Sequence, residues 1–115
     1  MTRVLSVEWE LLKEVRYEVL WPHLESVEEA RIDIDESKGA IHLAAFKGEE
    51  VVGVASLFLQ NCDRFPGFFE EEKVYRLRAI GVLDKVQGKG VGAAIIQEAL
   101  RVIKEEGVAV LWCDA

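Results

Sequence analysis

Residues Val74 to Glu106, which read VYRLRAIGVLDKVQGKGVGAAIIQEALRVIKEE, give the clearest indication of fold in this chain of 115 residues. The first part of this stretch, Val74–Val82, is rich in apolar and β-branched residues and predicts a strand. A glycine-rich turn, Gln87–Gly92, comes next. Apolar residues then recur at helical spacing, which predicts a helix from about Val91 to Glu106. The apolar residues that we expect this helix to bury are Ala94, Ile95, Leu100, Val102 and Ile103.

The elements around this stretch complete the predicted fold. Beyond Gly107, a residue type that commonly ends helices, the apolar run Val108–Cys113 predicts another strand. A strand, helix and strand in this order form a right-handed crossover if the two strands pair in parallel. Upstream, Ile41–Phe46 and Val51–Leu59 predict a hairpin, and Trp9–Leu20 predicts an amphipathic helix.

The remaining sequence indicates one domain. The segment Leu24–Gly39 is acidic and irregular, so we expect a loop there. We find neither a linker nor a repeat, and therefore expect a single α/β domain over residues 1–115.

Composition and charge limit the possible functions. The net charge of −7 argues against nucleic acid as a partner and is compatible with a cationic amine. No apolar stretch approaches the roughly 20 residues that span a bilayer, and no signal peptide is visible, so we expect a cytoplasmic protein without a membrane partner. Cys113 lies in an apolar run and is expected in the core, while Cys62 lies in a polar stretch. Neither cysteine has the spacing of a zinc site with the two histidines, so no metal is predicted.

The glycine turn carries the chemistry. Gly88, Gly90 and Gly92 lie between a strand and a helix, and the first amides of a helix have no partner within it. These amides and the helix dipole favour a phosphate group, and glycine lets its oxygens reach the backbone. Lys89 adds a positive charge. The turn therefore predicts a pyrophosphate site, although a purely structural glycine turn is the alternative.

Two other phosphate motifs fit less well. The P-loop needs a hydroxyl residue after its Gly-Lys pair, whereas here Lys89 is followed by Gly90 and Val91. The dinucleotide fingerprint is nearly matched, with Ala93 at its third glycine position. Alanine is tolerated there, but Glu105 and Glu106 lie within the helix rather than at the end of the next strand, where the fingerprint places its acidic residue.

Gln87-x-x-Gly90-x-Gly92 resembles the acetyl-CoA signature of the GNAT superfamily of N-acetyltransferases, (Arg/Gln)-x-x-Gly-x-(Gly/Ala). The strand before the turn, the helix after it and the tail Val110–Ala115 also resemble that family. The resemblance implies a GNAT-like (acyl-CoA N-acyltransferase) mixed sheet flanked by helices. It implies acetyl-CoA as co-substrate and a primary amine of a small molecule or peptide as acceptor.

The same resemblance implies a set of cofactor-binding residues. Backbone amides of Gln87, Gly88, Lys89, Gly90, Val91 and Gly92 would hold the pyrophosphate. Backbone groups of Ile80 and Val82 would pair with the pantetheine arm, as one more strand does at a sheet edge. The same strand would polarise the acetyl carbonyl.

The chain also departs from the family pattern. Relatives usually continue with another helix and two strands, which often carry a tyrosine that protonates the leaving thiolate. We therefore expect a shortened domain, completed as a homodimer through the edge of its last strand. The alternatives are a CoA-binding module that does not catalyse transfer and a dimeric interaction protein.

No catalytic base or acid is assigned. In many relatives a glutamate lies on the strand before the turn, where this chain has Arg76 and Arg78. These arginines could hold an anionic substrate group or pair with surface acids. The carboxylates nearest in sequence to this strand are Glu70–Glu72, and we expect them to be surface loop residues. Tyr75 could donate a proton, but its position favours the core.

Overall fold

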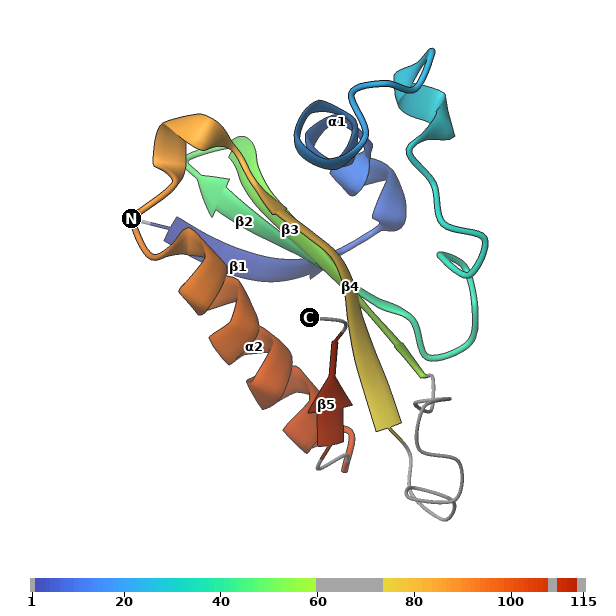
Figure 1. Ribbon diagram of the computed structural model, residues 1–115. Coiled ribbons are helices and arrows are strands. Elements are labelled where there is room, and N and C mark those ends of the chain that lie inside the picture. The colour runs from blue at the N-terminus through green and yellow to red at the C-terminus, as the bar shows by residue number, and fades with distance from the viewer. Residues whose placement is uncertain (1, 60–73, 108–109, 114–115) are drawn as a thin grey trace.

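The structure is a computed structural model that describes residues 2–59, 74–107 and 110–113 (Figure 1). The described residues form one five-stranded sheet in the order β1-β2-β3-β4-β5. The first three pairings are antiparallel and the last, between β4 and β5, is parallel. The strands are β1 (Thr2–Val7), β2 (Ile41–Lys47), β3 (Glu50–Leu59), β4 (Val74–Val82) and β5 (Val110–Trp112). The predicted mixed sheet is therefore confirmed.

Helices cover both faces of this sheet. The segment Trp9–Leu20 is helical throughout, as predicted, and combines a 3-10 turn η1 (Trp9–Leu12), an α-helical turn α1 (Lys13–Val15) and a π-helical turn η2 (Arg16–Leu20). Figure 1 shows α1 and α2 (Val91–Glu105) on opposite sides of the strands. Short 3-10 turns also occur at η3 (Val27–Glu29) and η4 (Asp84–Val86).

Two glycines show how closely these helices approach the sheet. A Cβ atom on Gly53 in β3 would lie 2.9 Å from Ile95 Cδ1 of α2. A Cβ atom on Gly81 in β4 would lie 3.3 Å from Leu20 Cγ of η2. Both contacts are tighter than ordinary packing, so the two glycines let the helices lie close to neighbouring strands.

The strand β1 was not predicted. Polar and apolar residues alternate only weakly in this segment, in which Arg3, Leu5 and Ser6 are exposed. Such a pattern does not indicate a strand. The segment pairs in continuous register with β2, from Thr2↔Lys47 to Val7↔His42. The hydrogen bonds of this pairing, rather than the local sequence, make the segment a strand.

The core face of α2 differs in part from the prediction. Val91, Ile95, Ala99 and Ile103 are buried at intervals of four residues, which is one helix face. The expectation for Leu100 was wrong, because its side chain is 49 % exposed. Ala94 and Val102 are half-buried. Full burial of side chains such as Ile95 contributes about 1.5–3 kcal/mol each, and so holds α2 on β2 and β3.

Several other expectations can be compared with the structure. The hairpin is confirmed, and Gly48 in its turn has φ of +63°. The acidic segment 24–39 is irregular, as expected, but it buries Ala30, Ile32 and Asp35. The expectation of a buried Cys113 was wrong because this residue is exposed where it follows the short β5. Cys62 lies outside the described residues. No helix among the described residues is long and apolar enough to cross a membrane.

Candidate functional site

The predicted glycine turn lies between η4 and α2 and has the backbone geometry that glycine allows. Gly88 has φ of +77°, and Gly90, which is the N-cap of α2, has φ of +81°. A side chain at either position would meet open space, so the conformation rather than the available room requires glycine. The turn thereby directs the chain into α2 with its first amides uncovered.

Hydrogen bonds leave several amides of this turn available. The amide of Gln87 donates to the Asp84 carbonyl at 3.2 Å, and that of Lys89 donates to the Val86 carbonyl at 3.3 Å. Among the residues that the structure describes, the amides of Gly88, Gly90, Val91 and Gly92 donate to no acceptor. These donors lie where the dipole of α2 is positive, an arrangement that suits an anion.

The Gln87 side chain connects the turn to β4, a role that the sequence analysis did not assign. Its Nε2 donates to the Val82 carbonyl at 3.2 Å and to Asp84 Oδ1 at 3.1 Å. The turn is therefore fixed to the end of β4 by a side chain as well as by the backbone.

The strands β4 and β5 part near the middle of β4. Their pairing runs from Val74↔Val110 to Arg76↔Trp112, and the Arg76 guanidinium lies 4.8 Å from the centroid of the Trp112 ring. Beyond this contact, β4 continues to Val82 with no described strand on that side. An open edge of β4 therefore begins beyond Arg76. Figure 1 shows β5 beside only the first part of β4.

The orientation of this edge follows from one hydrogen bond. The Leu83 amide donates to the Val52 carbonyl at 2.9 Å, so the backbone N–H of Leu83 points toward β3. Backbone groups of successive strand residues point to alternate sides. The N–H and C=O of Val82 therefore face the open side, in agreement with the contact between Gln87 and the Val82 carbonyl. Ile80 lies two residues earlier, where the register with β3 is irregular.

A β-bulge interrupts β4 beside this edge. Between the pairs Val54↔Gly81 and Ser56↔Arg78, β3 has the single residue Ala55, whereas β4 has Ala79 and Ile80. Ala79 has φ of +53°, the only positive φ of a non-glycine residue in the described part of the chain. Bulges bend a strand and redirect its backbone groups, and they are frequent next to active sites.

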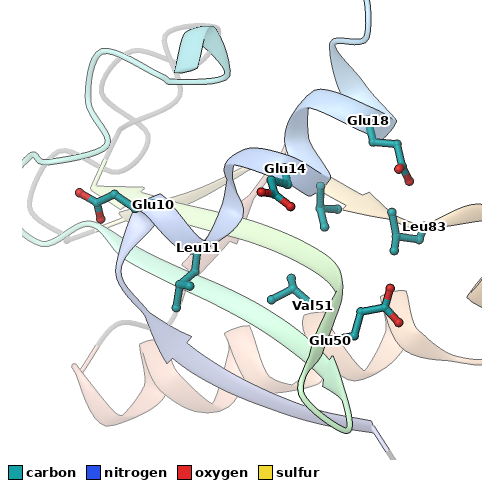
Figure 2. A pocket seen from close by; sticks show the side chains of 8 residues that line it. Glu10, Leu11, Glu14, Glu18, Glu50, Val51 and Leu83 are labelled. Carbon is teal, nitrogen blue, oxygen red and sulfur yellow. The ribbon is translucent and has the colours of Figure 1, made fainter. Parts of the chain in front are cut away.

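An acidic groove of about 430 Å³ lies between the Trp9–Leu20 segment and the ends of β3 and β4 (Figure 2). Its polar lining consists of glutamates, and Glu50 pairs with Lys85 at 2.5 Å. Among the described residues, no cation pairs with Glu10, Glu14 or Glu18. The residues that line this groove are Glu10, Leu11, Glu14, Val15, Glu18, Glu50, Val51 and Leu83.

Tyr75 and the acids Glu70–Glu72 are the remaining candidates for acid–base chemistry. Tyr75 is buried, as expected, and its hydroxyl donates to the Gly39 carbonyl at 2.9 Å. Burial raises the pKa of Tyr75, and the charge of Glu106 adds to this effect. The acids Glu70–Glu72 lie outside the described residues. Within the described ranges, no group of three or more His, Cys, Asp or Glu residues could hold a metal ion.

Comparisons with known proteins agree with this fold. The model of the acetyltransferase (GNAT) family matches residues 6–115. The uncharacterized N-acetyltransferase YitI of Bacillus subtilis (strain 168) is 29 % identical over 115 residues, which cover all of this chain and 74 % of YitI.

Solved structures share the fold at low sequence identity. AAC(6')-Iy in complex with the bisubstrate analog CoA-S-monomethyl-acetylneamine has a TM-score of 0.76 at 15 % identity, covering 100 % of this chain and 80 % of that chain. A predicted acetyltransferase from Clostridium acetobutylicum, solved with acetyl-CoA, has a TM-score of 0.70 at 14 % identity, covering 100 % and 81 %. Together with the family match over nearly the whole chain, these findings show that the chain belongs to the GNAT family of acetyltransferases.

Proposed function

We propose that this protein transfers the acetyl group of acetyl-CoA to a primary amine and binds acetyl-CoA along β4 and the glycine turn. One observation carries the proposal: the open edge of β4 leads directly to a turn with four amides that donate to no acceptor among the described residues. A strand-like arm that ends in a pyrophosphate needs such an edge and such a turn. The family match and the relatives that were solved with CoA groups support this assignment.

In this proposal, the pyrophosphate lies against the amides of Gly88, Gly90, Val91 and Gly92. The amides of Gln87 and Lys89 are engaged within the turn, so they shape the site rather than donate to the ligand. The Lys89 side chain is exposed and adds a positive charge beside the phosphates.

The pantetheine arm pairs with the backbone of Ile80 and Val82. Because the Val82 carbonyl already accepts a hydrogen bond from Gln87, pairing at this residue uses its amide. In this proposal, a backbone donor at the bulge of Ala79 and Ile80 would lie beside the thioester carbonyl. A fixed donor at that oxygen stabilises the negative charge that develops there during acyl transfer.

Bound acetyl-CoA supplies an activated thioester. The neutral amine attacks its carbonyl carbon, the new C–N bond replaces the C–S bond, the amine loses a proton, and the thiolate leaves and takes up a proton. The net charge of −7 attracts cationic acceptors over distance. A small-molecule amine is also consistent with the bisubstrate analog bound to AAC(6')-Iy.

The test is amine-dependent release of CoA thiol, measured over a panel of small amines and lysine peptides, with detection of the N-acetylated product. Gly90→Asp should abolish release because it places a carboxylate against the pyrophosphate. Gly107→Asp is the matched control, because Gly107 also has positive φ (+78°) and open surroundings but lies beyond the other end of α2. Equal activity in Gly90→Asp and the wild type would contradict the proposed site.

A further inference from the structure

A buried polar cluster lies between the Trp9–Leu20 segment and the sheet; we name it the Arg16 network, and its members are Arg16, Asp35, His42 and Ser56. The Arg16 guanidinium is completely buried and donates to Asp35 Oδ2 at 2.7 Å and to Asp35 Oδ1 at 2.8 Å. It also donates to Ser56 Oγ at 2.8 Å. The two charges are therefore paired through a two-point contact inside the protein.

The other two members extend this pair into the sheet. His42 in β2 lies directly opposite Ser56 in β3, and its Nδ1 is 2.7 Å from Ser56 Oγ. His42 Nε2 is 2.7 Å from the Asp35 carbonyl oxygen, which can only accept a hydrogen bond. A proton on Nε2 satisfies the contacts of His42 and Ser56: Arg16 donates to Ser56 Oγ, Ser56 donates to Nδ1, and Nε2 donates to the Asp35 backbone carbonyl.

Such a network is a costly way to fill a core. Burial by itself raises the pKa of Asp35, but hydrogen bonds from Arg16 and from the Ile32 amide outweigh it and lower that pKa overall. Replacing buried ion pairs by apolar residues of similar volume is often neutral or stabilising. Stability alone is therefore a poor explanation for the Arg16 network, whereas fixing one arrangement of the chain is a better one.

The position of Ser56 indicates which arrangement is fixed. Ser56 of β3 pairs with Arg78 of β4, and this is the last regular pair before the bulge. Ala55, the residue that precedes Ser56, lies opposite both residues of the bulge, Ala79 and Ile80. The φ of +53° at Ala79 is unfavourable for an alanine. Such conformations persist only where the surrounding structure over-determines them. Ser56 is held from β2 by His42 and from η2 by Arg16, so it provides a rigid support at one end of the bulge.

We propose that the Arg16 network is a positioning device for the bulge in β4, with Ser56 as the residue that couples the two. The inference rests on the proposed function, in which the bulge presents a backbone donor to the acetyl thioester. All four side chains are at least nine-tenths buried, so they act through β3 and β4 rather than by touching a substrate.

The test is a double-mutant cycle between Ser56→Ala and Ala79→Gly, since glycine adopts φ near +53° without strain. Ser56→Ala should accelerate hydrogen exchange of the Gly81 amide, which faces β3 opposite Val54 beside the bulge, at least tenfold and lower kcat at least tenfold, with little change in KM for the amine. Adding Ala79→Gly should restore both quantities to within about threefold of the Ala79→Gly protein. Ile103→Val, a buried change on the other face of the sheet, is the control for general loss of stability.

Unchanged Gly81 exchange in Ser56→Ala, or equal effects of Ser56→Ala with and without Ala79→Gly, would overturn the proposal. If Ser56→Ala does not fold, Ser56→Cys takes its place in the same cycle, because a thiol of similar size forms only weak hydrogen bonds. Hydrogen exchange is read on the protein without ligands. If the exchange rates show coupling between Ser56→Ala and Ala79→Gly but the protein transfers no acetyl group, the positioning role is supported and the proposed function is contradicted. Failure of the positioning role can therefore be distinguished from failure of the proposed function.

Discussion

Gln87 Nε2 lies 3.2 Å from the carbonyl oxygen of Val82, so the first residue of the glycine turn occupies the last backbone acceptor on the open edge of β4. This contact joins two parts of the candidate site, namely the strand edge for the arm and the turn for the phosphates. Because the Val82 carbonyl already accepts this hydrogen bond, a ligand that pairs with the edge of β4 cannot extend its pairing beyond Val82.

Replacing Gln87 should therefore weaken acetyl-CoA binding. Gln87→Leu removes one hydrogen bond between turn and strand, with a contribution of about 0.5–1.5 kcal/mol, which is roughly a 2- to 12-fold increase in Kd. Gln97→Leu, an exposed change on α2, is the matched control and should leave Kd unchanged. Equal Kd values for the two variants, measured by titration calorimetry, would show that the Gln87 contact does not shape the site.

The buried ion pair predicts a specific loss of stability. Asp35→Asn leaves the Arg16 charge buried without its partner and should lower the free energy of unfolding by about 3–5 kcal/mol at pH 7. Urea unfolding measures this quantity. Asp33→Asn, an exposed change two residues away, is the control and should have little effect. A loss in Asp35→Asn no larger than that in Asp33→Asn would contradict the description of this pair.

The same carboxyl group predicts how stability depends on pH. The pKa of Asp35 is lower in the folded protein than its ordinary value of 3.8, so the folded state binds this proton more weakly than the unfolded state. Its stabilising contribution is complete well above pH 3.8 and is lost as the pH falls through that value toward the lower folded pKa. In urea unfolding below about pH 5, Asp35→Asn should therefore lose less stability with falling pH than the wild type. Parallel curves for the two proteins would be inconsistent with this assignment.

The acidic groove predicts a gain of stability on removing charge. Glu14 lies four residues from both Glu10 and Glu18, and like charges at this spacing repel by about 0.2–0.5 kcal/mol per pair. Glu14→Gln should raise the free energy of unfolding by about 0.5 kcal/mol at low salt, and less at high salt. Glu98→Gln should give no such gain, because Glu98 pairs with Arg101 at 2.7 Å.

A free sheet edge predicts self-association. β5 has three residues and stands at one end of the strand order, where β4 is the described strand that pairs with it. Such edges recruit other strands. We expect a homodimer in sedimentation velocity at micromolar concentration, and a single monomeric species would contradict this expectation.

The sequence was most informative where the determinants are local. The glycine turn, β4, α2 and the hairpin follow from residue type and periodicity within short windows, and their bounds are confirmed within a few residues. The strand β1 was missed because its main support, pairing with β2, comes from residues about forty positions away. Leu100 was misassigned because the helix face follows the spacing of Ile95, Ala99 and Ile103.

The details of the site depend on contacts that a linear sequence does not show. The bulge at Ala79 arises from the register between β3 and β4, and nothing in the residue type alanine indicates a positive φ. The Arg16 network joins four distant positions. One signal for it was available, since Arg16 is four residues after Leu12 and thus falls on the buried face of the predicted helix.

Titration calorimetry of the protein with acetyl-CoA, using Gly90→Asp and Gly90→Asn as a pair, measures whether the glycine turn holds the phosphates. Asparagine tolerates positive φ and has the size of aspartate without its charge, so the pair separates charge from shape at the phosphate site. We predict micromolar binding to the wild type, binding at least tenfold weaker in Gly90→Asp, and a smaller loss in Gly90→Asn. No binding to the wild type, or equal binding to the wild type and Gly90→Asp, would contradict the account.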